Sequence, residues 1–384
     1  MKDNFPRART AIVAAATYGI GESPGLESMD LTVHASLKAL RAASLTPADV
    51  DAVFVCQPMD FLSGLTLSEY LGIQPKITDN NRIGGSSFMA HVIAAAQALV
   101  SGQCNVALVA YGSNQRTGSG KLVSSLREPY FESMYKPVMP LSAYALAASR
   151  HMHEYGTTRA QLAAVAVSAR QWAQRNPEAF MRGDLSVEDV LSARMVADPL
   201  SVRDCCLVTD GGAALVMMRA DEARDRTASP VYVLGGAAAT THRNITAMPD
   251  LTVTAARESG ARAYAQSGYG PQDIDVVELY DAFTINTILF LEDLGFCAKG
   301  EGGRFVEGGR IAPGGELPVN TNGGGLSCVH PGMYGLFALA EATHQLMGMA
   351  GERQVPGAKL ALAHGNGGML SSQATVILGT ADTV

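Results

Sequence analysis

The two halves of the sequence repeat the same order of predicted elements, and this repeat restricts the possible folds more than any other feature. The segment PADVDAVFV at 47–55 matches PQDIDVVEL at 271–279, and each reads as an acidic turn followed by a strand. In both halves a glycine-containing loop then opens a helix, at 84–87 and at 330–332. A duplicated architecture follows, with one half spanning 1–228 and the other 229–384.

Each half alternates strands with helices. Strands are expected at 10–17, 48–55, 105–111, 231–237, 273–279 and 359–363, and helices at 31–43, 86–100, 254–267 and 333–347. The strands are continuous apolar runs, which indicates sheets covered on both faces and hence an α/β fold. The segment from about 115 to 200 has no counterpart in the second half, so it reads as an insertion. An insertion of this kind either contributes to binding or caps the molecule at a subunit interface.

Composition excludes several classes of protein. The 384 residues carry a net charge of −7, so no broad basic surface for nucleic acid is expected. Apolar runs such as 92–100 are far shorter than the ~20 residues of a membrane-spanning helix. The six cysteines include no C-x-x-C pair, which disfavours a metal site, and a cytoplasmic chain with reduced thiols is expected. Only 17% of residues are charged, which suits either a large core or an oligomer.

Polar, glycine-rich segments stand where strands end or helices begin. They lie at 84–87, 209–213, 278–284, 320–325, 328–335 and 364–368. Ligands of open α/β sheets gather at the carboxyl ends of strands, where Tyr280 and His364 are predicted to lie. His330 is expected in a loop that opens a helix, where main-chain N–H groups face an anion. No segment has the pattern of a nucleotide P-loop or of a hydrolase nucleophile elbow.

Taken together, these segments resemble the thiolase superfamily over essentially the whole chain. The resemblance is carried by GGSSFMAHVIAAAQALVSG (84–102), TDGGAAL (209–215), YDAF (280–283), NTNGGGLSCVHPGMYG (320–335) and HGNGG (364–368). Within the superfamily the sequence is most similar to the sterol-carrier-protein-x thiolases, also known as nonspecific lipid-transfer proteins. The resemblance implies a duplicated five-layered thiolase fold and an enzyme that acts on acyl-CoA thioesters.

The sequence departs from that family at the nucleophile. Thiolases place a cysteine at the start of the 84–102 helix, and here Gly84, Gly85 and Ser86 fill that place. The second family cysteine is replaced in the last loop by His364. Ser86 or Ser87 is one alternative nucleophile, with His330 as base, although an oxyanion or helix-capping role for the serines is favoured. Cys328 is either a displaced nucleophile or a small packing residue.

Two tyrosines take motif positions instead. Tyr280 replaces the first residue of the family's N-E-A-F motif, and Tyr334 follows His330 by one helical turn. These features resemble the steroid side-chain aldolases, thiolase-fold enzymes that lack the cysteine and cleave β-hydroxyacyl-CoA by retro-aldol chemistry. A tyrosine whose pKa is lowered beside a histidine can exchange the proton. Tyr280 and Tyr334 are therefore predicted to form the acid/base pair.

Other residues receive supporting roles. His330 and nearby main-chain N–H groups are expected to hold the thioester oxygen. Asp281 is expected to orient its loop, Asp210 to brace a turn, and His364 either to add a polar contact or to bond only to main chain. The predicted oxyanion and substrate loop comprises Asn322, Gly324 and Gly367.

Three functional interpretations remain open at the level of sequence. The first is a retro-aldol lyase, the second an acyltransferase with an unusual nucleophile, and the third an inactive subunit that binds acyl-CoA or lipid. The resemblance also implies a homodimer and association with a small zinc-ribbon/OB-fold protein. Coenzyme A enters only as the substrate thioester, with no permanently bound cofactor, and basic residues between 116 and 194, including Lys121 and Arg127, are candidate contacts for it.

Overall fold

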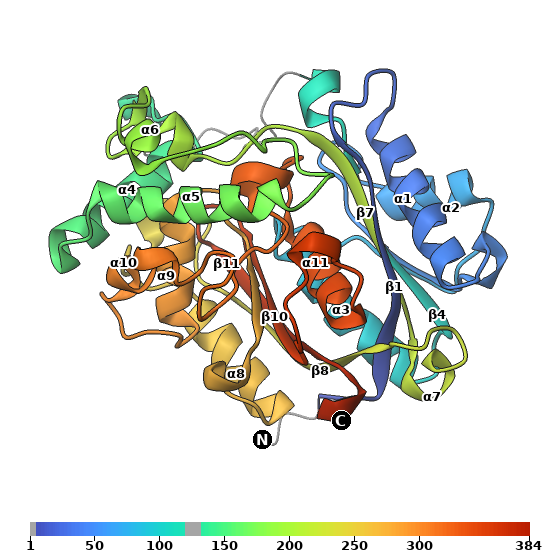
Figure 1. Cartoon of the computed structure of the whole chain (residues 1–384). Coiled ribbons are helices and arrows are strands. Elements are labelled where there is room, and N and C mark those ends of the chain that lie inside the picture. The colour runs from blue at the N-terminus through green and yellow to red at the C-terminus, as the bar shows by residue number, and fades with distance from the viewer. Residues whose placement is uncertain (1–4, 120–131) are drawn as a thin grey trace.

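The computed structural model describes residues 5–119 and 132–384 (Figure 1). Lys121 and Arg127 lie outside the described residues. The helices are α1 (Ser28–Ala42), α2 (Ser63–Leu71), α3 (Ser87–Val100), α4 (Leu141–Tyr155), α5 (Arg159–Gln174), α6 (Val187–Leu191), α7 (Ala220–Ala223), α8 (Ala256–Ser267), α9 (Thr284–Asp293), α10 (Gly302–Phe305) and α11 (Gly335–Met347). The strands are β1 (Thr10–Gly21), β2 (Ala52–Val55), β3 (Ile77–Asp79), β4 (Val106–Ser113), β5 (Met195–Ala197), β6 (Leu200–Ser201), β7 (Asp210–Arg219), β8 (Val231–Thr240), β9 (Val276–Leu279), β10 (Leu360–Gly367) and β11 (Ser372–Gly379).

The strand order demonstrates the duplication. In the described part of the chain, nine strands form one sheet in the order β3-β2-β4-β7-β1-β8-β11-β10-β9. The series β2-β4-β7-β1 of the first half corresponds to β9-β10-β11-β8 of the second. In both series the first pair is parallel and the next two are antiparallel. Within the described sheet, a short pairing of β1 with β8 joins the two halves.

The repeated sequence segment has the same conformation in both halves. Pro47–Asp49 and Pro271–Asp273 each form a 3₁₀ turn that leads into a strand. The aspartate that follows each turn then accepts hydrogen bonds from the two main-chain N–H groups that begin the neighbouring strand. Asp51 binds the residues before β4, and Asp275 binds those that begin β10. The local match therefore reflects a repeated device that aligns two parallel strands.

Helices α3 and α11 form the middle of five layers. They pack on each other and on strands of both halves, whereas α1 covers β1, β4 and β7 from outside and α8 covers β8 and β11 (Figure 1). Because it lies between the two halves of the sheet, α11 is buried almost all round, and small side chains such as Ala95 and Ala96 bring α3 close to its neighbours. The duplicated five-layered thiolase fold is confirmed.

The predicted elements are all present, with one consequential difference in length. Strand β10 continues to Gly367, paired with β11 throughout, so His364 lies inside a strand rather than in a loop. The described parts of the inserted segment include α4, α5 and α6. Helices α4 and α5 pack on α9, α5 also packs on α10, and α6 packs on α5 (Figure 1).

Candidate active site

The sheet and the two middle helices bring several loops together. Tyr280 and Asp281 directly follow β9, and His330 lies in the loop that leads into α11, with Tyr334 at its N-cap. Helix α11 packs on β9, β10 and α3, so the start of α3 approaches the same place. The fold therefore gathers the predicted motif residues from both halves.

Three aromatic rings form the centre of the site. The ring centroids of Tyr280 and His330 are 5.4 Å apart with nearly perpendicular planes, and those of Tyr280 and Tyr334 are 5.8 Å apart. The His330 and Tyr334 planes are nearly parallel, with centroids 6.4 Å apart. The expected one-turn helical spacing is wrong, however, because α11 begins only at Gly335. A loop that turns at Gly332, where φ is +90°, produces the contact instead.

Tyr280 lies directly against the loop that carries the nucleophile in thiolases. A Cβ atom at Gly85 would stand 1.8 Å from Cε2 of Tyr280, so only glycine fits beside this ring. The Tyr280 hydroxyl donates a long hydrogen bond of 3.3 Å to the carbonyl of Gly332. The Tyr280 ring therefore leaves no room for a side chain at position 85, and its hydroxyl is only loosely held.

Tyr334 is held more firmly. Its hydroxyl donates to Oδ1 of Asn322 at 2.9 Å, and the same oxygen accepts the main-chain N–H of Gly324 at 2.7 Å. The predicted substrate-loop residue Asn322 thus orients a tyrosine through its side-chain oxygen. Gly324 is required for space, since a Cβ there would stand 2.0 Å from Oδ2 of Asp281.

His330 is anchored by its main chain and open at its ring. Its N–H donates to Oγ1 of Thr209 at 3.0 Å, and its carbonyl accepts the Thr209 N–H at 3.3 Å. Its Nε2 atom is buried and has no hydrogen-bond partner among the described residues. Burial lowers the pKa of His330 to about 4, so the imidazole is neutral near pH 7. A neutral ring with an open nitrogen is suited to bind a ligand oxygen.

The expected lowering of a tyrosine pKa is wrong. Burial, followed by the charge of Cys206, raises the pKa of Tyr280 well above its usual value, and contact with the Tyr334 main chain opposes this only in part. Burial and then the charges of Asp281 and Glu278 raise the pKa of Tyr334 as well. Both hydroxyls are therefore protonated at neutral pH, which limits the chemistry to routes without a resting phenolate.

The two motif aspartates brace loops. Oδ1 of Asp281 accepts the N–H of Gly325 at 2.6 Å, and burial raises the pKa of Asp281 to about 7. Asp210 accepts main-chain N–H groups from Ser23, Arg116 and Thr117. Both residues act as expected from the sequence.

The serines of the 84–87 loop bond to their own loop rather than to a histidine. Ser86 Oγ donates to the carbonyl of Ile83 at 3.0 Å and contacts Ser372 Oγ, and Ser87 Oγ accepts the Ile83 N–H. Neither contact caps α3 in the expected way, because Ser86 makes no side-chain cap hydrogen bond. A Cβ at Gly367 would stand 1.7 Å from the Ile83 carbonyl oxygen, so Gly367 permits close packing of this loop.

His364 does not join the ring cluster. It pairs in register with Leu279, the residue before Tyr280, and side chains alternate between faces along a strand. Its Nδ1 contacts Thr375 Oγ1 and its Nε2 contacts Gln373 Oε1, both at 2.9 Å. Both nitrogens therefore contact side chains of β11, so the alternative of bonds to main chain only is wrong, and neither nitrogen faces the ring cluster.

No cysteine has the properties of an activated nucleophile. Burial raises the pKa of all six thiols, and Cys328 Sγ accepts a hydrogen bond from the Asn176 side chain. Cys328 therefore fits the packing alternative.

Sequence reasoning missed several residues that support the site. The Tyr111 hydroxyl donates to the carbonyl of Pro331 and accepts the N–H of Met333, which fixes the loop before α11. Cys206 donates its main-chain N–H to Ala282, beside Asp281. Asn176, from the inserted segment, donates to the carbonyl of Asn322. None belongs to a motif that was singled out, and only the fold places them here.

Comparison with known families agrees with this fold. The family model "Thiolase, N-terminal domain" matches residues 9–221, and "Thiolase C-terminal domain-like" matches residues 237–380. The chain therefore belongs to the thiolase family, and it is an enzyme of that superfamily.

Two relatives and one solved structure narrow the position within the superfamily. The chain is 36% identical to an acetyl-CoA acetyltransferase of Methanothermobacter thermautotrophicus, over 93% of this chain and 96% of the relative. It is 32% identical to the 17-hydroxy-3-oxo-4-pregnene-20-carboxyl-CoA lyase of Mycobacterium tuberculosis, over 88% and 92%. The structure of an Ltp2-ChsH2(DUF35) aldolase superposes with a TM-score of 0.87 and 29% identity, over 97% and 98%. The resemblance to the aldolase branch is thus confirmed.

Across residues 5–119 and 132–384, no group of three or more His, Cys, Asp and Glu side chains is placed to hold a metal ion. Within the same residues, no helix has both the length and the apolar character needed to cross a membrane.

Proposed function

We propose that this enzyme cleaves a β-hydroxyacyl-CoA by a retro-aldol reaction, without a covalent acyl-enzyme. The observation that carries the proposal is the Nε2 atom of His330, which is buried beside Tyr280 and Tyr334 and has no hydrogen-bond partner among the described residues. In addition, burial raises the pKa of the thiols, Cys328 included, so no cysteine is an activated nucleophile. Acyl transfer through a thioester needs an activated nucleophile, and retro-aldol cleavage does not.

The proposed reaction can proceed with Tyr280 and His330 both uncharged at rest. In one concerted exchange, the Tyr280 hydroxyl takes the proton of the substrate β-hydroxyl while it gives its own proton to Cα. As this happens the Cα–Cβ bond breaks, its electron pair forms the new Cα–H bond, and the β-carbon becomes the ketone. The enolate charge that develops on the thioester oxygen is held by His330 as an Nε2–H donor, and the products are the ketone and the shortened acyl-CoA. Tyr280 gains no net charge in this exchange, so its raised pKa is compatible with the proposed role.

The test is to incubate the purified protein with a β-hydroxyacyl-CoA that has a tertiary hydroxyl, including one with a polycyclic acyl group. We expect a ketone and a shortened acyl-CoA, constant free CoA and an unchanged protein mass. The reaction with and without a co-expressed partner should be compared. An acyl adduct on Ser86, Ser87 or Cys328 would replace this proposal by acyl transfer, and CoA binding without product would favour an inactive subunit.

A partner protein is also proposed. The solved aldolase structure that resembles this chain is named for two components, Ltp2 and ChsH2(DUF35). A small zinc-ribbon/OB-fold protein would complete the substrate channel, and any zinc would belong to that protein.

Arg170 is excluded from the candidate CoA contacts, since it is 4% exposed and its Nε atom binds Ser327 Oγ at 3.0 Å.

We further propose that the chain forms a homodimer through the edge of the sheet at β3. Strand β3 pairs only with β2 among the described residues, and the adjoining surface exposes Phe61, Leu65 and Tyr70 by 77%, 60% and 57%. An exposed apolar edge favours pairing with a second copy.

Light scattering during size-exclusion chromatography should therefore give twice the chain mass at micromolar concentration. The double change F61E/L65K should yield a folded monomer, because charges on the apolar edge oppose its burial. Met349, 62% exposed and outside this surface, provides the control M349K, which should remain dimeric. A monomeric parent would contradict the dimer.

A further inference from the structure

Asn176 connects the inserted segment to the ring cluster. It follows α5 and is 2% exposed, although it belongs to a segment that has no counterpart in the second half of the chain. Its main-chain N–H bonds to Ala173 in the turn that ends the helix. A buried amide in such a turn must satisfy its donors and its acceptor within the protein.

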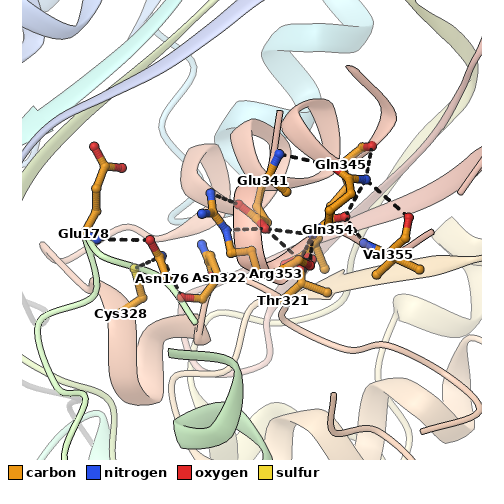
Figure 2. Close-up of polar contacts among 12 residues, drawn as sticks. Asn176, Glu178, Thr321, Asn322, Cys328, Glu341, Gln345, Arg353, Gln354 and Val355 are labelled. Carbon is orange, nitrogen blue, oxygen red and sulfur yellow. Dashed lines mark hydrogen bonds and ion pairs between the residues drawn. The ribbon is translucent and has the colours of Figure 1, made fainter. Parts of the chain in front are cut away.

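The two ends of the Asn176 amide face different neighbours (Figure 2). Its oxygen accepts the N–H of Glu178 at 3.1 Å, within its own turn. Its nitrogen donates to the carbonyl of Asn322 at 2.9 Å and to Cys328 Sγ at 3.5 Å. The local turn therefore orients the amide so that its N–H groups donate to Asn322 and Cys328, the two ends of the 322–328 loop.

Asn322, whose carbonyl accepts this hydrogen bond, is the residue that orients Tyr334. Asn322 accepts the Tyr334 hydroxyl on Oδ1, while its main-chain carbonyl is held by Asn176. A continuous series of hydrogen bonds thus runs from Asn176 through Asn322 to Tyr334, whose ring lies alongside His330.

We propose that Asn176 is a positioning residue for the reaction, acting through Asn322 on Tyr334. This inference rests on the proposed retro-aldol function. Asn176 touches neither Tyr280 nor His330 in any contact described above, so its effect passes through the loop. Other bonds hold the same loop to the inserted segment, from Phe180 and Met181 main chain to the carbonyls of Cys328 and Ser327. Loss of the Asn176 amide should therefore misplace Tyr334 without releasing the loop.

The test compares N176A and N176D with the parent enzyme. We expect kcat of N176A to fall by ~10-fold or more with KM nearly unchanged. Tyr334 packs against both Tyr280 and His330, so its displacement would also misplace the two groups that act in the proposed reaction. The matched control is Q174A, because Gln174 is exposed and its amide binds only Asp184 in the described contacts. Q174A should keep the parent kcat.

The aspartate variant adds a pH readout that a merely structural role would not produce. A carboxylate at 176 would face the Asn322 carbonyl without a proton to donate, and such a carboxyl has a raised pKa. As pH falls and it protonates, the O–H donates again, so kcat of N176D should recover relative to the parent. Parental kcat in N176A, or identical pH profiles for N176D and parent, would overturn the inference.

A third measurement separates this inference from the proposed function. In protein carrying [ζ-¹³C]tyrosine, the Tyr334 signal can be assigned with Y334F. N176A should shift that signal and spare distant tyrosines, whether or not the parent cleaves the aldol substrate. An inactive parent with a shifted signal would refute the function alone, and an active parent with an unshifted signal would refute the positioning role alone.

Discussion

Replacing Tyr280 with phenylalanine is expected to reduce kcat/KM by ~10²–10⁴-fold, the range typical of losing a positioned acid–base group. The change removes only the hydroxyl, and that hydroxyl makes one long hydrogen bond of 3.3 Å to the Gly332 carbonyl. The ring would still pack against Gly85, so the midpoint of thermal unfolding should change little. Steady-state kinetics on the β-hydroxyacyl-CoA provides the measurement.

The control for Y280F is Tyr264, a half-buried tyrosine whose hydroxyl also donates to a carbonyl, that of Leu294, at 3.0 Å. Y264F should retain parental kcat/KM, because Tyr264 lies on α8 in an outer layer. If Y280F also retained parental kcat/KM, Tyr280 would have no part in proton exchange. If both variants lost activity together with stability, a structural explanation would replace the chemical one.

The sequence predicted the framework because its signals are local or repeated. Apolar runs gave the strands, and the acidic turns at Asp51 and Asp275 gave the duplication that the strand order then showed. Motif order also placed Tyr280, His330 and Tyr334 in one site, since all three stand next to ends of neighbouring elements.

What the sequence could not predict depends on pairing and burial. The extension of β10 to Gly367 results from its pairing with β11, and this pairing turns His364 away from Tyr280. The raised pKa of Tyr280 follows from its surroundings, which only the packed fold defines. Asn176 lacked any motif signal, because its contact with Asn322 joins segments that are far apart in the chain.

A network of buried charged and amide side chains contacts Thr321, the residue next to Asn322 (Figure 2). Arg353 binds Glu341 through two hydrogen bonds of 2.9 and 3.0 Å. The Thr321 hydroxyl contacts both Glu341 and Glu278 at 2.8 Å. Arg353 holds the pKa of Glu341 below its usual value against the effect of burial, whereas burial and the Glu341 charge raise that of Glu278. Glu341 is therefore the ionised partner and Glu278 the protonated one.

Replacing Arg353 with methionine should consequently destabilise the protein by ~3–5 kcal/mol at neutral pH, because a buried carboxylate loses its only described cation. In the parent, the lowered pKa of Glu341 gives stability that is present above the unfolded value of 4.5 and is lost as pH falls. The difference between R353M and parent should thus be largest at neutral pH and shrink toward acid. Denaturant unfolding at several pH values measures it.

Two comparisons test whether the buried charge of Glu341 causes the expected loss of stability in R353M. The exposed pair Arg304–Glu301 gives the control R304M, which should cost less than ~1 kcal/mol. The double variant R353M/E341Q should regain much of the lost stability, because no buried carboxylate is left without its cation. Equal costs for R353M and R304M would show that Glu341 is neutral in the folded protein. The proton that we place on Glu278 would then have to lie on Glu341 instead.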